Sequence, residues 1–179
     1  MNIKLKLEEL NRIGIDEFNA AKKTPIIVIA DDLRSLNNIG SLFRTGDAFR
    51  IEKIYLAGIT ATPPHRDITK TALGSTKSVR WEKADDLREL VKDLKSKGVA
   101  VYAIEQTTNS IALDQFQPSG KNKTAIIFGN EVSGVQQSVI DLCDGSIEVP
   151  QIGTKHSLNI AVCAGIVIWE LYQKLKKAH

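Results

Sequence analysis

The sequence predicts an α/β fold in which a parallel sheet is covered by helices. Five short runs of apolar residues have strand character, and segments with helical periodicity lie between them. The apolar runs are continuous rather than alternating in polarity, which is typical of strands buried on both faces. Alternation of strands and helices along a chain indicates the α/β class. A chain of 179 residues has room for one such domain.

Each predicted strand is a short run rich in β-branched or aliphatic residues, and Pro25 opens the first of them. The predicted strands are residues 26–30, 53–57, 99–104, 124–128 and 146–149.

Helical patterns separate these runs. The clearest lies between Asp85 and Gly98, where apolar residues recur at steps of three and four, acidic residues begin the helix and glycine ends it. Residues 2–12 are typical of a short basic amphipathic helix or tail, and 62–65 of a surface loop. The predicted helices are residues 38–50, 66–73, 84–97, 133–143 and 157–177.

The charge is unevenly divided along the chain. The formal net charge is +3, and residues 1–83 hold 14 Lys and Arg against 10 Asp and Glu, whereas residues 84–179 hold 10 against 11. A basic face in the N-terminal half would attract phosphates, although scattered solvating charges explain the count equally well. An aromatic content of 6% argues against stacking platforms for single-stranded RNA.

Cys143 and Cys163 stand among aliphatic residues on predicted helices, outside any metal-type cluster, so we expect buried structural thiols. The N-terminus has no uninterrupted apolar core of a signal peptide, and no apolar run reaches transmembrane length. A cytoplasmic protein without membrane contact is the expectation.

Three polar islands stand where a predicted strand gives way to a helix. They are residues 37–46, residues 128–134 and residues 149–159. Open α/β sheets bind ligands at the carboxyl ends of their strands, so we expect the islands to converge. The dinucleotide fingerprint G-x-G-x-x-G and the Walker G-x-x-x-x-G-K-[ST] pattern are both missing from the sequence. Ordinary dinucleotide and NTPase sites are therefore disfavoured.

The chemistry of each island has a structural alternative. Arg44 is suited to binding a phosphate, and the alternative is an arginine solvated at the edge of a helix. Glu131 is suited to a substrate contact, and the alternative is a solvated surface acid. Ser157 and Asn159 are candidate ligand contacts, and equally a helix cap. Gly129 and Gly134 allow a sharp turn with free backbone groups.

Taken together, the islands resemble the three motifs of the SpoU class of SPOUT RNA 2′-O-ribose methyltransferases. The matching residues are Asn38-x-Gly40-x-x-x-Arg44, then Gly129-Asn130-Glu131-x-x-Gly134, then Val149-Pro150 followed by Ser157-Leu158-Asn159.

This resemblance implies methyl transfer from S-adenosylmethionine to a ribose 2′-hydroxyl of structured RNA, without a metal. It also implies a basic extension at 1–24 before a methyltransferase domain at 25–179, whose parallel α/β sheet ends in a deep trefoil knot at about 124–174. Composition and periodicity do not suggest a knot, because knots are nearly absent from protein folds. Relatives act as homodimers that pack through the knot region.

The resemblance also assigns roles to residues. Arg44 matches the proposed activator of the hydroxyl, either taking its proton or orienting an RNA phosphate that does so. The residues expected to orient Arg44, the ribose and the knot loops are Asn38, Glu131, Ser157 and Asn159. The residues expected to hold the cofactor, largely through backbone groups, are Glu105, Gly129, Val149 and Leu158.

The chain departs from larger relatives because it lacks their separate N-terminal RNA-binding domain, which favours tRNA over ribosomal RNA as substrate. Two further alternatives remain open: a non-catalytic RNA-binding or ribosome-assembly protein on the same fold, and a knotted methyltransferase acting on a base nitrogen. The Asn38 and Arg44 pair with the Ser157-Leu158-Asn159 motif favours ribose.

Overall fold

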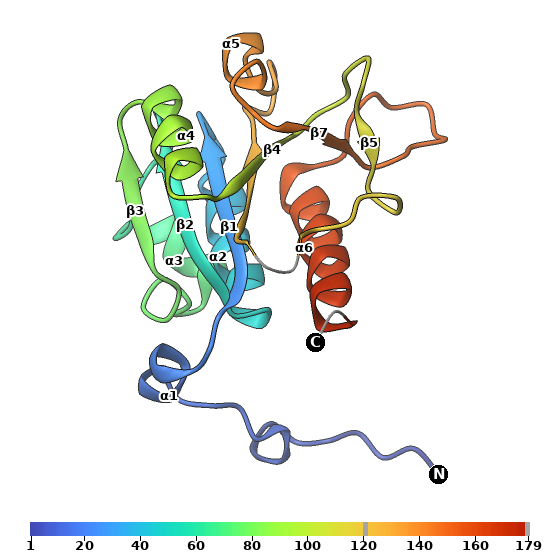
Figure 1. The fold of residues 1–179 in the computed structure, drawn as a ribbon. Helices are drawn as coiled ribbons and strands as arrows, with labels where there is room; N and C mark the ends of the chain where they lie inside the picture. Colours follow the sequence, from blue (N-terminus) through green and yellow to red (C-terminus); the bar gives the residue numbers. More distant parts are fainter. Residues whose placement is uncertain (120–121, 178–179) are drawn as a thin grey trace.

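The structure is a computed structural model that describes residues 1–119 and 122–177. A seven-stranded sheet forms its centre, with helices on both faces (Figure 1). In chain order the elements are η1 (Leu7–Leu10), α1 (Ile15–Ala20), β1 (Thr24–Asp31), α2 (Leu36–Ala48), β2 (Ile51–Ala57), α3 (Arg66–Ala72), β3 (Trp81–Ala84), α4 (Leu87–Ser96), β4 (Ala100–Ile104), β5 (Ile111–Ala112), β6 (Thr124–Phe128), α5 (Gln137–Ile140), β7 (Gly145–Glu148) and α6 (Ile160–Lys177).

The strand order is β3-β2-β1-β6-β4-β7-β5, and every neighbouring pair is parallel. The order departs from the chain order at β1, which pairs with β2 on one side and with β6 on the other. Strand β4 then lies between β6 and β7. The carboxyl ends of β1, β6, β4 and β7 therefore meet at one edge of the sheet, which is where ligands bind in open α/β folds.

Each face of the sheet has its own apolar core. In β1 the side chains of Ile26, Val28 and Ala30 pack with α2, α3 and α6, whereas Ile27 and Ile29 pack with α4 and α5. These five side chains are at most 5% exposed. The burial of both faces explains why the strand sequences are continuously apolar.

The predicted α/β class and parallel sheet are confirmed, and all five predicted strands are present.

Capping explains the helix boundaries. The Asp86 carboxylate accepts hydrogen bonds from the backbone N–H groups of Arg88 and Glu89, which begins α4. Gly98, with φ of +76°, follows the end of the same helix.

Two expectations about secondary structure were wrong. Strands β3 and β5 were missed, because β3 is a four-residue edge strand with exposed Glu82 and Lys83, and β5 has two residues. The predicted helix 133–143 is reduced to α5, because Gly134 has φ of +66° and pairs with Asn130 in an isolated bridge. For segment 2–12, a helix or a tail was expected, and the structure agrees with the tail, since the segment contains only the single turn η1.

The N-terminal segment runs away from the sheet (Figure 1), and Phe18 of α1 is its one residue that is buried in the core. Both cysteines are half-buried rather than fully buried, and Cys143 lies in the turn after α5 instead of on a helix. Within residues 1–119 and 122–177 no helix is long and apolar enough to span a membrane.

Candidate functional site

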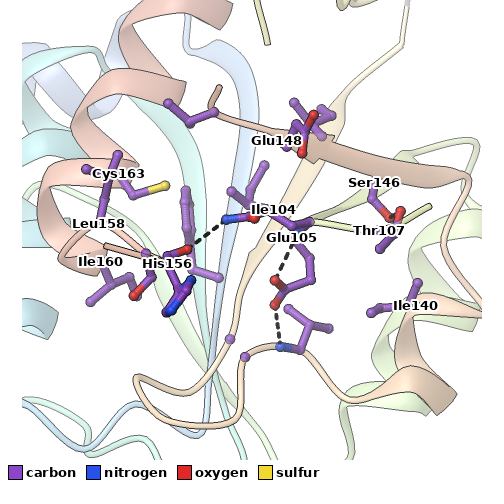
Figure 2. A pocket seen from close by; sticks show the side chains of 18 of the residues that line it. Ile104, Glu105, Thr107, Ile140, Ser146, Glu148, His156, Leu158, Ile160 and Cys163 are labelled. Carbon is purple, nitrogen blue, oxygen red and sulfur yellow. Dashed lines mark hydrogen bonds between the residues drawn. The ribbon is translucent and has the colours of Figure 1, made fainter. Parts of the chain in front are cut away.

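The second and third polar islands line one cavity of about 1090 Å³ at the carboxyl edge of the sheet, and Asn38 of the first island contacts two of its lining residues. Its walls come from the loops that follow β4, β6 and β7 and from the start of α6 (Figure 2). Seven of the nine residues predicted for the site line it, namely Glu105, Gly129, Glu131, Val149, Ser157, Leu158 and Asn159.

Glu131 joins the first island to the second. Its carboxylate accepts hydrogen bonds from the backbone N–H groups of Arg34 and Ser35, both at 3.1 Å, and from the side-chain amide of Asn38 at 3.2 Å. Desolvation by partial burial raises the pKa of Glu131, but these hydrogen bonds outweigh it, so the pKa lies below its ordinary value. Glu131 is therefore a carboxylate at neutral pH and holds the start of α2 against the second island.

Asn38 and Asn159 extend this connection to the third island. The amide nitrogen of Asn159 lies 3.4 Å from the Asn38 side-chain oxygen. The Asn159 side-chain oxygen accepts from the N–H groups of Ala161 and Val162 and so caps α6. Helix α6 begins at Ile160. Ser157 therefore lies before the helix and is not its cap, contrary to one alternative from the sequence.

The second island is a tight turn that only glycine permits at two positions. A Cβ at Gly129 would lie 2.2 Å from the Gly134 carbonyl carbon, and one at Gly134 would lie 2.3 Å from a carboxylate oxygen of Glu105. The Asn130 side chain closes the turn, since its oxygen accepts from the Val132 N–H at 2.9 Å. Its amide nitrogen donates to the carbonyl of Asp32, the residue directly after β1.

Glu105 and Gln106, at the end of β4, bind the loops on either side of the cavity. The Glu105 carboxylate accepts from the backbone N–H of Val135 at 3.1 Å and from that of Gln106 at 3.0 Å. The Gln106 side chain donates to the carbonyl of His156 at 2.8 Å (Figure 2). Sequence reasoning missed Gln106, and its position directly after a buried strand, beside Glu105, was the available signal.

Arg44 is not among the residues that line the cavity. It lies on the exposed surface of α2 and lines a second hollow of about 930 Å³, together with Arg12 and Arg50. Asn38 is also outside the cavity lining, but it contacts the lining residues Glu131 and Asn159. Within one chain, the structure thus brings together every predicted site residue except Arg44.

The lining of the cavity carries negative charge. Glu105, Glu131 and Glu148 contribute carboxylates, and no Lys or Arg is found among the described lining residues. Burial raises the pKa of Cys163, another lining residue, to about 11, and the charge of Glu105 adds to this effect. The thiol is therefore neutral at physiological pH. Such a cavity favours a ligand that carries positive charge.

The described residues contain no group of three or more His, Cys, Asp or Glu side chains placed to hold a metal ion. The cavity lining includes backbone N–H and C=O groups of the turns, three carboxylates and the apolar side chains of Ile104, Leu158 and Ile160. This mixture fits an organic ligand with an apolar ring and a few polar edges.

Comparison with known proteins gives a family and a fold. The model of the SpoU rRNA Methylase family matches residues 25–169. The tRNA (guanosine(18)-2′-O)-methyltransferase of Thermus thermophilus is 29% identical over 173 residues, which are 95% of this chain and 86% of that protein. The 23S rRNA (guanosine-2′-O-)-methyltransferase RlmB of Vibrio parahaemolyticus is 26% identical over 163 residues, which are 91% of this chain and 65% of that protein.

Among solved structures, the SpoU methyltransferase AviRb from Streptomyces viridochromogenes, in complex with the cofactor AdoMet, superposes with a TM-score of 0.76. It is 19% identical, and the match covers 92% of this chain and 65% of that one. This likeness establishes that the two chains share a fold.

Proposed function

Since the chain belongs to the SpoU rRNA Methylase family and is an S-adenosylmethionine-dependent RNA 2′-O-methyltransferase, we propose that its substrate is a structured tRNA. The observation that carries the proposal is the cavity at the carboxyl edge of the sheet, which the second and third motifs line and which Asn38 of the first motif adjoins. The tRNA methyltransferase of T. thermophilus aligns over 86% of its length, whereas the ribosomal RNA enzyme RlmB aligns over 65%. The chain therefore matches the compact tRNA enzyme more completely.

We propose that the cavity holds S-adenosylmethionine. The cofactor supplies a methyl group on a positively charged sulfonium, and the cavity offers three carboxylates and no described Lys or Arg to that charge. Gly129, Val149 and Leu158 would present backbone groups to the polar edge of the adenine. Leu158 and Ile160 would cover its ring. Glu105 lines the same cavity, and its carboxylate holds the Val135 N–H.

The catalytic residues in this proposal are Arg44, Asn38, Glu131, Ser157 and Asn159. Transfer requires the ribose oxygen to be aligned with the methyl group and its proton to be removed. An arginine guanidinium stays protonated in proteins, so Arg44 would bind an RNA phosphate that accepts the proton and would stabilise the developing alkoxide. Asn38, Glu131 and Asn159 form a connected set of hydrogen bonds that positions the ribose side of the cavity.

Replacement of the phosphate next to the target ribose by an uncharged methylphosphonate tests this assignment. If the phosphate accepts the proton, the rate constant for methyl transfer should fall at least tenfold while cofactor binding stays unchanged. An unaltered rate would favour the alternative role, in which Arg44 itself takes the proton from the hydroxyl.

We also propose that two chains pack through α6. Val162, Ile166 and Trp169 recur at steps of four and three on this helix, and they are 54%, 39% and 49% exposed. Side chains with this spacing share one helix face, and an apolar face open to water favours association. Light scattering should give a dimer mass for the wild type and a monomer mass for Ile166→Glu. A monomeric wild type at working concentration would contradict the proposal.

The division of the chain belongs to the same proposal. Residues 1–24 would form a basic extension and residues 25–179 the methyltransferase domain, with a trefoil knot at about 124–174. The match of the family model to residues 25–169 and the start of β1 at Thr24 support this boundary. Family likeness alone supports the knot.

The test is transfer of labelled methyl groups from S-adenosylmethionine to separated tRNA and ribosomal RNA fractions that lack modifications. Arg44→Ala tests the active site, and Arg88→Ala, an exposed arginine on α4, is the control. Alkaline hydrolysis identifies the product, because a 2′-O-methyl group blocks cleavage at the modified nucleotide.

Label in tRNA that resists hydrolysis and is lost in Arg44→Ala supports the proposal. Label found only in the ribosomal RNA fraction would mean that the substrate is ribosomal RNA and not tRNA. Label that leaves the backbone cleavable would indicate a methylated base. Cofactor binding without transfer to either fraction would indicate a non-catalytic RNA-binding protein.

A further inference from the structure

One wall of the cavity has very little support of its own. Residues 150–158 connect β7 to the cap of α6, and every side chain in this segment is exposed. Among the described residues, its one hydrogen bond to the rest of the protein is the bond from the Gln106 side-chain nitrogen to the carbonyl of His156, at 2.8 Å (Figure 2). The conformation of this wall therefore depends strongly on a single side chain.

The opposite wall of the cavity is the second island, and Glu105, the residue before Gln106, holds it. Glu105 holds the second island through the Val135 N–H, so consecutive side chains at the end of β4 bind the two sides of the cavity. Strand β4 pairs with β6 and with β7. It is thus an interior strand, and it provides a rigid base for both attachments.

We propose that Gln106 is a positioning residue that holds segment 150–158 closed against the cavity, and that breaking its bond to His156 opens the cavity for ligand exchange. The closed segment places Ser157 and Leu158 at the cavity, where both are lining residues. The part of the proposal that concerns closure rests on the hydrogen bond alone. The part that concerns the exchanged ligand rests on the proposed function.

Two substitutions break the bond in different ways. Gln106→Leu removes the donor at similar volume, and Gln106→Glu places an acceptor-only carboxylate opposite the His156 carbonyl. Gln106 is exposed, so neither change disturbs the core. Gln115→Leu is the matched control, because Gln115 is also exposed and its side chain has no hydrogen bond within the described part of the chain.

Limited trypsin digestion of the ligand-free protein tests closure, because Lys155 lies in this exposed segment next to His156. A neutral hydrogen bond of ordinary net strength corresponds to about a five-fold change in an equilibrium, so cleavage after Lys155 should be about five-fold faster in Gln106→Leu than in the wild type. Gln106→Glu should show at least the same effect, and Gln115→Leu should match the wild type. Equal rates of cleavage after Lys155 in all four proteins would overturn the proposal.

Kinetics test the exchanged ligand. In Gln106→Leu the KM for S-adenosylmethionine should rise about five-fold, with kcat at saturation changed less than two-fold and faster dissociation of S-adenosylhomocysteine. A fall in kcat at unchanged KM would overturn the positioning role. If the wild type binds no S-adenosylmethionine, the proposed function fails, whereas trypsin cleavage after Lys155 still decides whether Gln106 closes the segment.

Discussion

The side-chain amide of Asn38 donates to the carboxylate of Glu131 at 3.2 Å, across a sequence separation of 93 residues. The same carboxylate accepts the backbone N–H groups that precede α2. Glu131 therefore anchors the beginning of a helix and orients a side chain that in turn contacts Asn159. One carboxylate thus connects all three motifs, although it is exposed to solvent.

Glu131→Gln should weaken this connection. The amide keeps one acceptor oxygen but turns an NH₂ group towards backbone N–H donors. Because hydrogen bonds to a charged group are the stronger ones, methyl transfer should fall about tenfold or more. Steady-state kinetics with saturating cofactor and RNA measure the effect. Glu89→Gln, on the exposed face of α4, is the control and should behave as the wild type.

The same variant has a pH signature in stability. The folded-state pKa of Glu131 lies below its ordinary value of 4.5, so its contribution is present above pH 4.5 and is lost as pH falls through the lower, folded-state pKa. Urea unfolding should therefore show the wild type more stable than Glu131→Gln at pH 7, with the difference shrinking towards pH 3. A difference independent of pH would contradict the assignment.

Asp31 should have the opposite pH dependence. Its side chain is 5% exposed, and burial, followed by the charge of Asp32, raises the pKa to about 6 from an ordinary 3.8. As pH rises, the Asp31 carboxyl loses its proton at a lower pH in the unfolded chain than in the folded protein. The free energy of unfolding therefore falls between about pH 4 and about pH 6 and stays lower above about pH 6. Asp31→Asn should increase the free energy of unfolding at pH 8 by about 2 kcal/mol.

Urea unfolding of wild type and Asp31→Asn at pH 8 and pH 4 checks this prediction. The gain should be largely absent at pH 4, where the wild-type carboxyl is already neutral. Equal gains at both pH values would mean that the asparagine acts through packing instead of charge.

Lys174 ties the loop after β5 to α6. Its ammonium donates to the carbonyls of Leu113, Asp114 and Phe116 at 2.7–2.8 Å and lies 3.2 Å from the Glu170 carboxylate. The side chain is 12% exposed. Lys174→Met leaves three carbonyls without this donor, and the free energy of unfolding should fall by about 2–3 kcal/mol.

The matched control for Lys174 is Lys176→Met, two residues further along α6 on its exposed surface. It should change stability by less than about 0.5 kcal/mol. Similar losses in both variants would show that the charge at the helix C-terminus matters, and not the three carbonyl contacts.

The basic N-terminal segment should contribute to RNA affinity through phosphates. Lys4, Lys6 and Arg12 are exposed, and Arg12 lines the same hollow as Arg44. If all three contact phosphates, their joint replacement by alanine should flatten the slope of log affinity against log salt by about 2 to 3. Filter binding from 50 to 300 mM salt measures the slope, and an unchanged slope would place the RNA elsewhere. Truncation before residue 11 leaves Phe18 in the core and is a second version of the test.

Local sequence patterns were sufficient for the α/β class and for the carboxyl-edge position of the site. Continuous apolar runs show burial on both faces, and parallel strands place their carboxyl ends at one edge. The same reasoning failed for β3, which is short and charged at the sheet edge, and for the helix expected at 133–143. There Gly134 adopts a left-handed conformation and pairs with Asn130, which a helical pattern does not reveal.

The sequence by itself determined five of the seven strands, the long helices α2, α4 and α6 and the residue types of the three motifs, because these depend on interactions between near neighbours in the chain. Only the tertiary structure decided which groups meet. The bonds of Glu131 to Asn38 and of Gln106 to His156 span 93 and 50 residues, and they exist because the strand order brings those loops to one edge. The tertiary structure likewise placed Arg44 outside the cavity of its own chain. Spacing along the sequence carries no information about such contacts, since they follow from the packing of whole elements.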